Sequence, residues 1–99
     1  MEASGVSRLN AVIHERARLG IMSVLAARPA LTFGELKTLL DMTDGNLSVH
    51  LRILEQAGYV SIEKKFVERK PQTTVKLSKK GRLAFEHYVE VLEEIVRKK

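Results

Sequence analysis

Hydrophobic residues recur at helical spacing over much of the chain's first half. From Leu9 to Leu25 they recur so that they share one side of a helix, which predicts an amphipathic helical region. Pro29 ends this region, because proline disfavours helical geometry in the residue before it. The spacing leaves open whether one helix forms, or a short helix followed by a longer one. Residues 1–7 precede the pattern and are expected to form a flexible tail.

Two shorter helices are predicted after the proline from their capping residues. Thr32 and Glu35 have the spacing of a capping box, in which each side chain accepts a hydrogen bond from the other residue's backbone N–H. Thr43 can cap the next helix, residues 44–57, and Gly58 supplies the left-handed geometry favoured just past a helix end. The buried side of this second helix is predicted to consist of Leu47, Leu51 and Leu54.

The hydrophobic period then changes from helical to alternating, which predicts a β-hairpin. Residues 60–67 form one alternating run and residues 73–77 the other, and a polar, proline-containing stretch, residues 68–72, joins them. An isolated hairpin is marginal in water, so its apolar face must lie against the helices. This face is predicted to comprise Val60, Ile62, Val75 and Leu77.

A last helix, residues 79–97, is capped by Ser78. The predicted order is helix, helix, helix, strand, strand, helix, which is an α+β fold, mostly helical. A single hairpin excludes a sandwich or a wound parallel sheet. A chain of 99 residues is long enough for one domain, so residues 1–99 are expected to form a single unit.

Charge is distributed unevenly along the chain. The net charge is +5, but residues 64–82 contain eight basic residues and one acid, for a net +7, while the segments on either side are each net −1. Concentrated positive charge attracts polyanions, of which nucleic acid is the commonest. A solvated basic loop is the alternative that charge alone leaves open.

The two short helices fit a helix-turn-helix, whose second helix enters the major groove of DNA. Its outward side must be small and polar, and residues 44–52 meet this requirement. Cations near the hairpin loop could reach phosphates or a minor groove. The candidate DNA-binding residues are Thr43, Asp44, Asn46, Ser48, Val49, Arg52, Lys65, Arg69 and Lys70.

Residues 31–36 and 43–60, with the hairpin over residues 66–77 and the following residues 77–82, resemble winged-helix transcriptional regulators of the MarR and ArsR type. The resemblance covers about residues 9–97. It implies a winged helix-turn-helix fold with three helices, a hairpin wing (residues 66–73) and a long C-terminal helix. It also implies that residues 44–57 form the recognition helix, that Asn46, Ser48, Val49 and Arg52 face DNA, that Arg69 and Lys70 occupy the wing tip, and that the protein is a dimer.

The last helix has more apolar residues than one narrow stripe requires. Four of them follow a spacing suited to a seam between two helices. We expect this helix and the segment from Leu9 to Ile13 to form a two-fold homodimer interface, although one broad core-facing stripe is an alternative. The expected interface residues are Leu9, Val12, Ile13, Phe85, Tyr88, Leu92 and Ile95.

No constellation of residues indicates catalysis, a metal or a cofactor. Cysteine is absent, and His14, His50 and His87 are isolated in the sequence. The metal-sensing role of cysteine-containing relatives is therefore not supported. The first residues lack a basic segment followed by an apolar one, so no signal peptide is expected. No run approaches the roughly 18 apolar residues of a membrane span, so none is expected. Together with the missing cysteines, this favours the cytoplasm.

The function predicted is a regulator that binds double-stranded DNA sequence-specifically, expected to be a dimeric repressor and not an enzyme. One alternative is a winged-helix module that binds proteins and does not read DNA; an exposed Val49 is the only hint of it. Another is non-specific coating of chromatin or RNA. All five aromatic residues fit core or dimer positions, which argues against base stacking: Phe33, Tyr59, Phe66, Phe85 and Tyr88.

Overall fold

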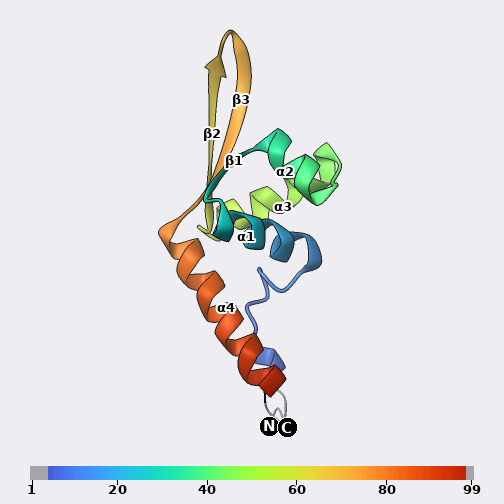
Figure 1. Cartoon of the computed structure of the whole chain (residues 1–99), viewed down its shortest axis with the longest axis vertical. Helices are drawn as coiled ribbons and strands as arrows, with labels where there is room; N and C mark the ends of the chain where they lie inside the picture. The colour runs from blue at the N-terminus through green and yellow to red at the C-terminus, as the bar shows by residue number, and fades with distance from the viewer. Residues whose placement is uncertain (1–4, 98–99) are drawn as a thin grey trace.

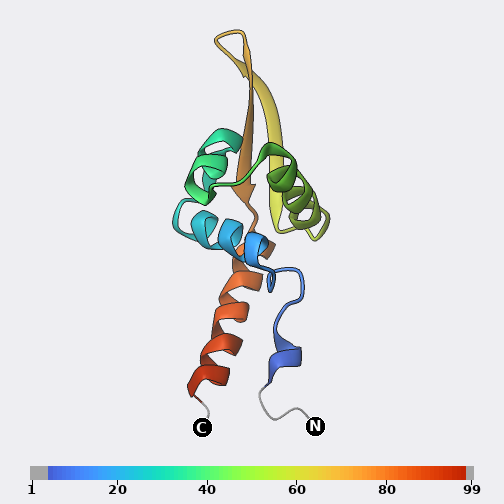
Figure 2. The ribbon, with the colours of Figure 1, turned by 90° about the vertical axis from the view of Figure 1, so that its right-hand side faces the viewer.

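A computed structural model describes residues 5–97. A body of three helices lies in the middle, a long hairpin projects from one end, and the last helix extends from the other (Figures 1 and 2). This is the predicted winged-helix arrangement. The elements are a 3₁₀ helix (Val6–Arg8), α1 (Arg16–Ala27), β1 (Ala30–Thr32), α2 (Phe33–Leu40), α3 (Asp44–Gln56), β2 (Val60–Val67), β3 (Lys70–Leu77) and α4 (Lys79–Arg97).

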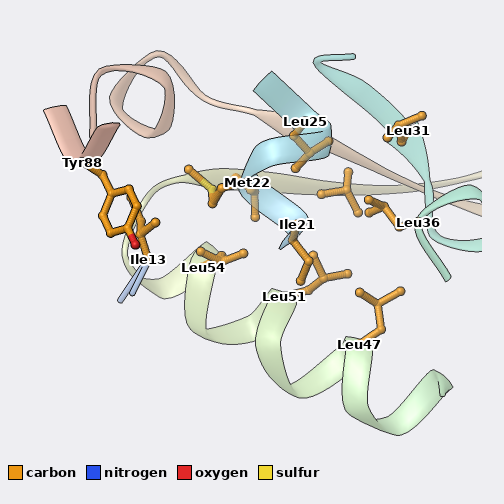
Figure 3. Packing of buried hydrophobic residues seen from close by; sticks show 12 residues of the cluster. Ile13, Ile21, Met22, Leu25, Leu31, Leu36, Leu47, Leu51, Leu54 and Tyr88 are labelled. Atoms are coloured by element: carbon orange, nitrogen blue, oxygen red, sulfur yellow. The ribbon is translucent and has the colours of Figure 1, made fainter. Parts of the chain in front are cut away.

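The core lies between the inner sides of the three helices and the base of the sheet. Ile21 and Met22 of α1 face Leu51 and Leu54 of α3 (Figure 3), and all four side chains are buried. The predicted leucine stripe of α3 is therefore confirmed, because residues spaced by three and four positions share one side of a helix. Leu36, Val60, Val75 and Tyr88 also belong to this core cluster.

The caps predicted from sequence are present. Thr32 and Glu35 form the reciprocal capping box of α2. The Thr43 hydroxyl accepts from the Asn46 backbone N–H at 3.2 Å at the start of α3, and Gly58 has φ 81° after its end. These signals act between residues that are close in sequence, so they do not depend on the rest of the fold.

The segment before α1 differs from expectation. Only Arg16–Ala27 is α-helical, whereas residues 11–13 form turns. The cause is local, because the Asn10 side-chain oxygen accepts from the backbone N–H groups of Val12 and Ile13 at 2.9 and 3.1 Å. Part of the expected tail is also ordered into the 3₁₀ helix Val6–Arg8; residues 1–4 lie outside the described residues.

The sheet has a third strand that the sequence did not reveal. Its order is β1-β3-β2, with β1 antiparallel to the base of β3. Strand β1 has only three residues, too few for an alternating pattern to be recognised. Because β1 covers β3 only at residues 74–76, the outer part of the hairpin is two-stranded.

The hairpin is longer and its turn tighter than predicted. The expected loop over residues 68–72 is wrong: Glu68 and Arg69 alone form the turn, and Lys70 pairs directly with Val67. Both turn residues have positive φ, 50° and 68°, as a two-residue type I′ turn requires. Pro71 is tolerated in the strand because its pair with Phe66 is one of those in which the backbone nitrogen points away from the partner strand.

The inner face of the hairpin is buried only near its base. Val60 and Val75 are buried, but Phe66, which the sequence placed in the core or a dimer contact, is 76% exposed. Alternation places Phe66 on the same face as Val60 and Ile62. It is exposed because the strands continue past the helices that would have covered it (Figure 1).

Candidate nucleic-acid interface

The outward side of α3 is slim and accessible. Successive side chains around the helix divide it into a central line and two flanks. Val49, at 52% exposure, and Arg52 lie along the middle, and Gly45 and Gln56 extend that line. Ser48 and Arg52 turn towards the hairpin, whereas Asn46 turns towards the start of α1. Asn46 and Ser48 therefore lie on opposite flanks, a separation that their spacing of two residues already implies.

A polar cluster holds the body side of α3 against α1. The Arg18 guanidinium donates to the His50 Nδ1 at 3.0 Å and to the Val12 carbonyl at 2.6 Å. In this contact the His50 Nδ1 is the acceptor, because an arginine can only donate. The Arg18 backbone N–H donates to the Glu15 carboxylate at 2.9 Å, and this bond lowers the pKa of Glu15 below its usual value. This cluster orients α3, and the sequence analysis did not identify Arg18 or Glu15.

Two of the predicted DNA-binding residues have structural roles at the start of α3. The Thr43 hydroxyl caps α3, and the Asp44 carboxylate lies 2.8 Å from the Lys37 ammonium of α2. Both partners of this ion pair are on the surface, so the pair stabilises the turn only slightly. Lys37 was not predicted as part of the site; its ammonium group lies beside Asp44 at the N-terminus of α3.

A groove of about 710 Å³ separates α3 from the hairpin. Arg52 of α3 and Lys64 of β2 both line it, together with the hydroxyls of Ser48 and Thr73. Glu55 is the acid among its lining residues. A second groove, about 540 Å³, lies on the other flank of α3, where Asn46, His50 and Glu15 line it.

The hairpin tip (residues 64–71) carries most of the exposed positive charge near this groove. It contains four basic residues and one acid, a net charge of +3. Arg69 is in the turn itself, and Lys65 and Lys70 lie on the face opposite Phe66. No ion pair involving these three cations occurs among residues 5–97. They are therefore available to phosphates.

Two of the expected dimer residues are in the chain's own core. Ile13 and Tyr88 are 0% and 2% exposed, so neither presents surface to a second chain. Tyr88 is fixed there, since its hydroxyl lies 2.8 Å from His14 Nδ1. Leu9, Val12 and Phe85 are half-buried against the core, Ile95 is half-buried, and Leu92 is exposed.

The exposed apolar residues of α4 form a different stripe from the one predicted. Val89, Leu92 and Val96 are exposed, and with Phe85 they recur at a four-three-four spacing. This is also a spacing typical of a seam between two helices. It differs from the predicted seam because Val89 and Val96 take the places of Tyr88 and Ile95, so the seam is rotated around the helix axis. We name Phe85, Val89, Leu92 and Val96 the α4 seam. Leu83 is also exposed, on the other side of the helix.

Within residues 5–97, no cluster of three or more histidine, aspartate or glutamate residues could hold a metal ion. None of the helices in this range has the length and apolarity needed to cross a membrane.

Comparison with known proteins gives consistent results. A family model described as a winged helix DNA-binding domain matches residues 17–96. An uncharacterized protein of Methanocaldococcus jannaschii is 35% identical over 83 residues, which cover 83% of this chain and 90% of that protein. A solved transcriptional regulator homologue from Pyrococcus horikoshii OT3 has a TM-score of 0.88 and 29% identity, with 93% of both chains covered.

A more distant solved structure shares the fold. It is a putative regulator of the MarR family from Enterococcus faecalis V583, with a TM-score of 0.75 and 23% identity over 94% of this chain and 84% of that one.

Proposed function

This chain belongs to the winged helix DNA-binding domain family, and on that premise we propose that it is a dimeric transcriptional regulator that binds double-stranded DNA sequence-specifically and represses by occluding a promoter. One observation carries the proposal. The exposed side of α3 and the hairpin lie on either side of one groove, which is lined by Arg52 of α3 and by Lys64, the first residue of the cationic hairpin tip. The two elements can therefore contact one duplex together.

In this proposal α3 occupies the major groove. The groove is about 12 Å wide, and the small residues Gly45, Ser48 and Val49 allow the helix to approach the base edges closely. Asn46 can bond bidentately to adenine, and Val49 can contact a thymine methyl. Arg52 can bind either guanine or a phosphate. Because Asn46 and Ser48 lie on opposite flanks, we expect them to contact different base pairs.

The hairpin supplies the phosphate contacts. A backbone strand that separates the major groove from the adjacent minor groove would lie in the groove between α3 and β2. Arg52 and Lys64 would face it from the two sides, and Thr73 offers a hydroxyl donor. Arg69 and Lys70 at the tip would reach the next phosphates.

Dimerisation is proposed to occur through the α4 seam. Three of its four apolar side chains are exposed in the isolated chain, and a two-fold axis along α4 would leave both α3 helices free in the body beyond the start of α4 (Figure 1). Two recognition helices about 34 Å apart would meet successive major grooves of a pseudo-palindromic site.

The proposal is tested by selecting bound duplexes from a random pool with the purified protein. We expect an enriched motif made of two inverted half-sites with centres about 10 base pairs apart. Binding to this motif should weaken steeply with salt, because lysine and arginine displace counterions from phosphates. Failure to retain any duplex at low salt would exclude DNA binding, and retention without enrichment would exclude sequence reading.

A protein-binding module is the second candidate, since Val49 is exposed on α3. In that case Val49→Asp would abolish partner capture, and removing the hairpin cations would not.

A further inference from the structure

Phe66 is the most exposed large hydrophobic side chain in residues 5–97, at 76%. Single exposed apolar residues are common on protein surfaces and need no explanation by themselves. Phe66, however, is an aromatic residue one pair away from the last pair before the hairpin turn. The hairpin itself projects from the helical body (Figure 2). Three further observations indicate what covers Phe66 in the functional complex.

The first is the face on which the ring lies. Phe66 pairs with Pro71 across the hairpin, and strand alternation places it on the same face as Ile62 and Lys64. Ile62 and Lys64 line the groove that the hairpin shares with α3. The ring is therefore on the side of the hairpin that faces the recognition helix, and not on its back.

The second is the charge around the ring. Lys64 lies on the same face as Phe66, Arg69 lies in the turn, and Lys65 and Lys70 lie on the opposite face, against the single acid Glu68. An apolar protein surface that enclosed the hairpin tip would have to bury these cations without partners, which is costly. A polyanion with apolar surfaces between its charges satisfies both the ring and the cations, and the stacked bases of a duplex between its two phosphate backbones have this property.

The third is the reach of the hairpin. From Ile62, the last half-buried residue of β2, to the turn at Glu68 the strand extends by roughly 20 Å at about 3.3 Å per residue. Half a turn of B-DNA is about 17 Å, which separates a major groove from the minor groove next to it. A hairpin beside α3 thus has the length to place its tip at that minor groove.

We propose that Phe66 is a wedge that inserts between two base steps in the minor groove flanking the site of α3, and that it kinks the duplex there. This inference rests on the proposed function. Proteins that insert apolar side chains in this way pay for unstacking with additional backbone contacts, which Arg69 and Lys70 would provide. The site would favour a flexible pyrimidine–purine step under the ring, although no hydrogen bond reads it.

The wedge is tested with the selected duplex carrying 2-aminopurine, whose fluorescence rises on unstacking, at successive positions of each flank. We expect the unmodified protein to raise fluorescence several-fold at one step only. Phe66→Ala should abolish the rise and lower affinity about tenfold, the order of a lost aromatic–base contact. Phe66→Leu should retain part of the rise, because leucine also acts as a wedge.

The matched control is Val67→Ala, which removes an exposed apolar side chain, 40% accessible, from the opposite face of the same strand. It should leave the fluorescence unchanged, and both alanine variants should melt as the unmodified protein does. Tight duplex binding without any local rise would overturn the wedge alone, whereas no binding would overturn the proposed function as well. A change of oligomeric state in Phe66→Ala, with the fluorescence rise intact, would assign Phe66 to a contact with a second copy.

Discussion

The hairpin tip and α4 both project from the helical body and both expose apolar side chains, but they differ in charge. Residues 64–71 have a net charge of +3, whereas α4 (Lys79–Arg97) contains four glutamates and four basic residues, a net charge of zero. The net charge of the first attracts a polyanion and that of the second does not. We therefore assign the exposed apolar surface of the hairpin tip to DNA and that of α4 to a second copy of the chain.

The strongest test concerns the joint from which both projections start. A Cβ on Gly81 would lie 2.1 Å from the Tyr59 carbonyl oxygen, which is backbone and cannot move aside easily. Gly81→Ala should therefore separate α4 from the hairpin base and destabilise the fold by about 3 kcal/mol in urea unfolding. The matched control is Gly45→Ala on α3, where no atom lies within 4 Å.

That control should instead stabilise the protein by about 0.5–1 kcal/mol, because alanine loses less backbone entropy than glycine in a helix. Equal stability of the two variants would show that α4 does not need its close approach to Tyr59.

The role of α4 is tested by placing a charge in the α4 seam. Leu92→Asp should convert the dimer to a monomer at micromolar concentration in sedimentation, because an unpaired buried carboxylate is costly. Leu83→Asp adds the same charge half a turn around the helix, where we assign no contact. A dimer that survives Leu92→Asp but not Leu83→Asp would move the interface to the other side of α4.

The cationic end is tested with the double variant Arg69→Ala/Lys70→Ala. It should weaken binding to all duplexes, and the slope of log affinity against log salt should fall by about 2, one for each lost phosphate contact. Sedimentation of this variant should be unchanged. An unchanged salt slope would show that the hairpin tip does not contact phosphates.

A smaller effect is expected at the turn. Glu68 has φ 50°, a left-handed geometry that asparagine adopts more readily than glutamate. Glu68→Asn should stabilise the hairpin by roughly 0.5 kcal/mol and also remove the acid of the tip, so that DNA affinity rises slightly. Hydrogen exchange of the amides of β2 and β3 measures the first effect. Faster exchange would contradict the assigned turn.

The smallest effect lies in the body between the two ends. The pKa of Glu15 is lowered in the folded state, so its carboxylate contributes stability above its unfolded pKa, and this is lost as pH falls through the folded pKa. The unfolding free energy of the unmodified protein should therefore exceed that of Glu15→Gln at pH 7, and the difference should shrink below about pH 4.5. A difference independent of pH would exclude a role for the charge.

Different parts of the molecule were predictable from sequence to different degrees. The capping box of Thr32 and Glu35 and the exposed Val49 were predicted correctly, because each depends on neighbours within one or two helical turns. The pairing of Arg18 with His50 was not found, since 32 residues separate them and neither belongs to a motif. The DNA and dimer roles of individual residues remain predictions.

The sequence by itself determined the order of helices and strands, the inward side of α3 and the cationic character of the hairpin, because periodicity, caps and local charge act over a few residues. Only the tertiary structure decided which apolar side chains are buried. Tyr88 turned into the core and the seam moved to Val89 and Val96, while Phe66 was left uncovered. Burial depends on which distant elements lie beside a residue in the folded chain. A strand that extends past its neighbouring helices keeps its alternating pattern, but its outer apolar side chains are exposed.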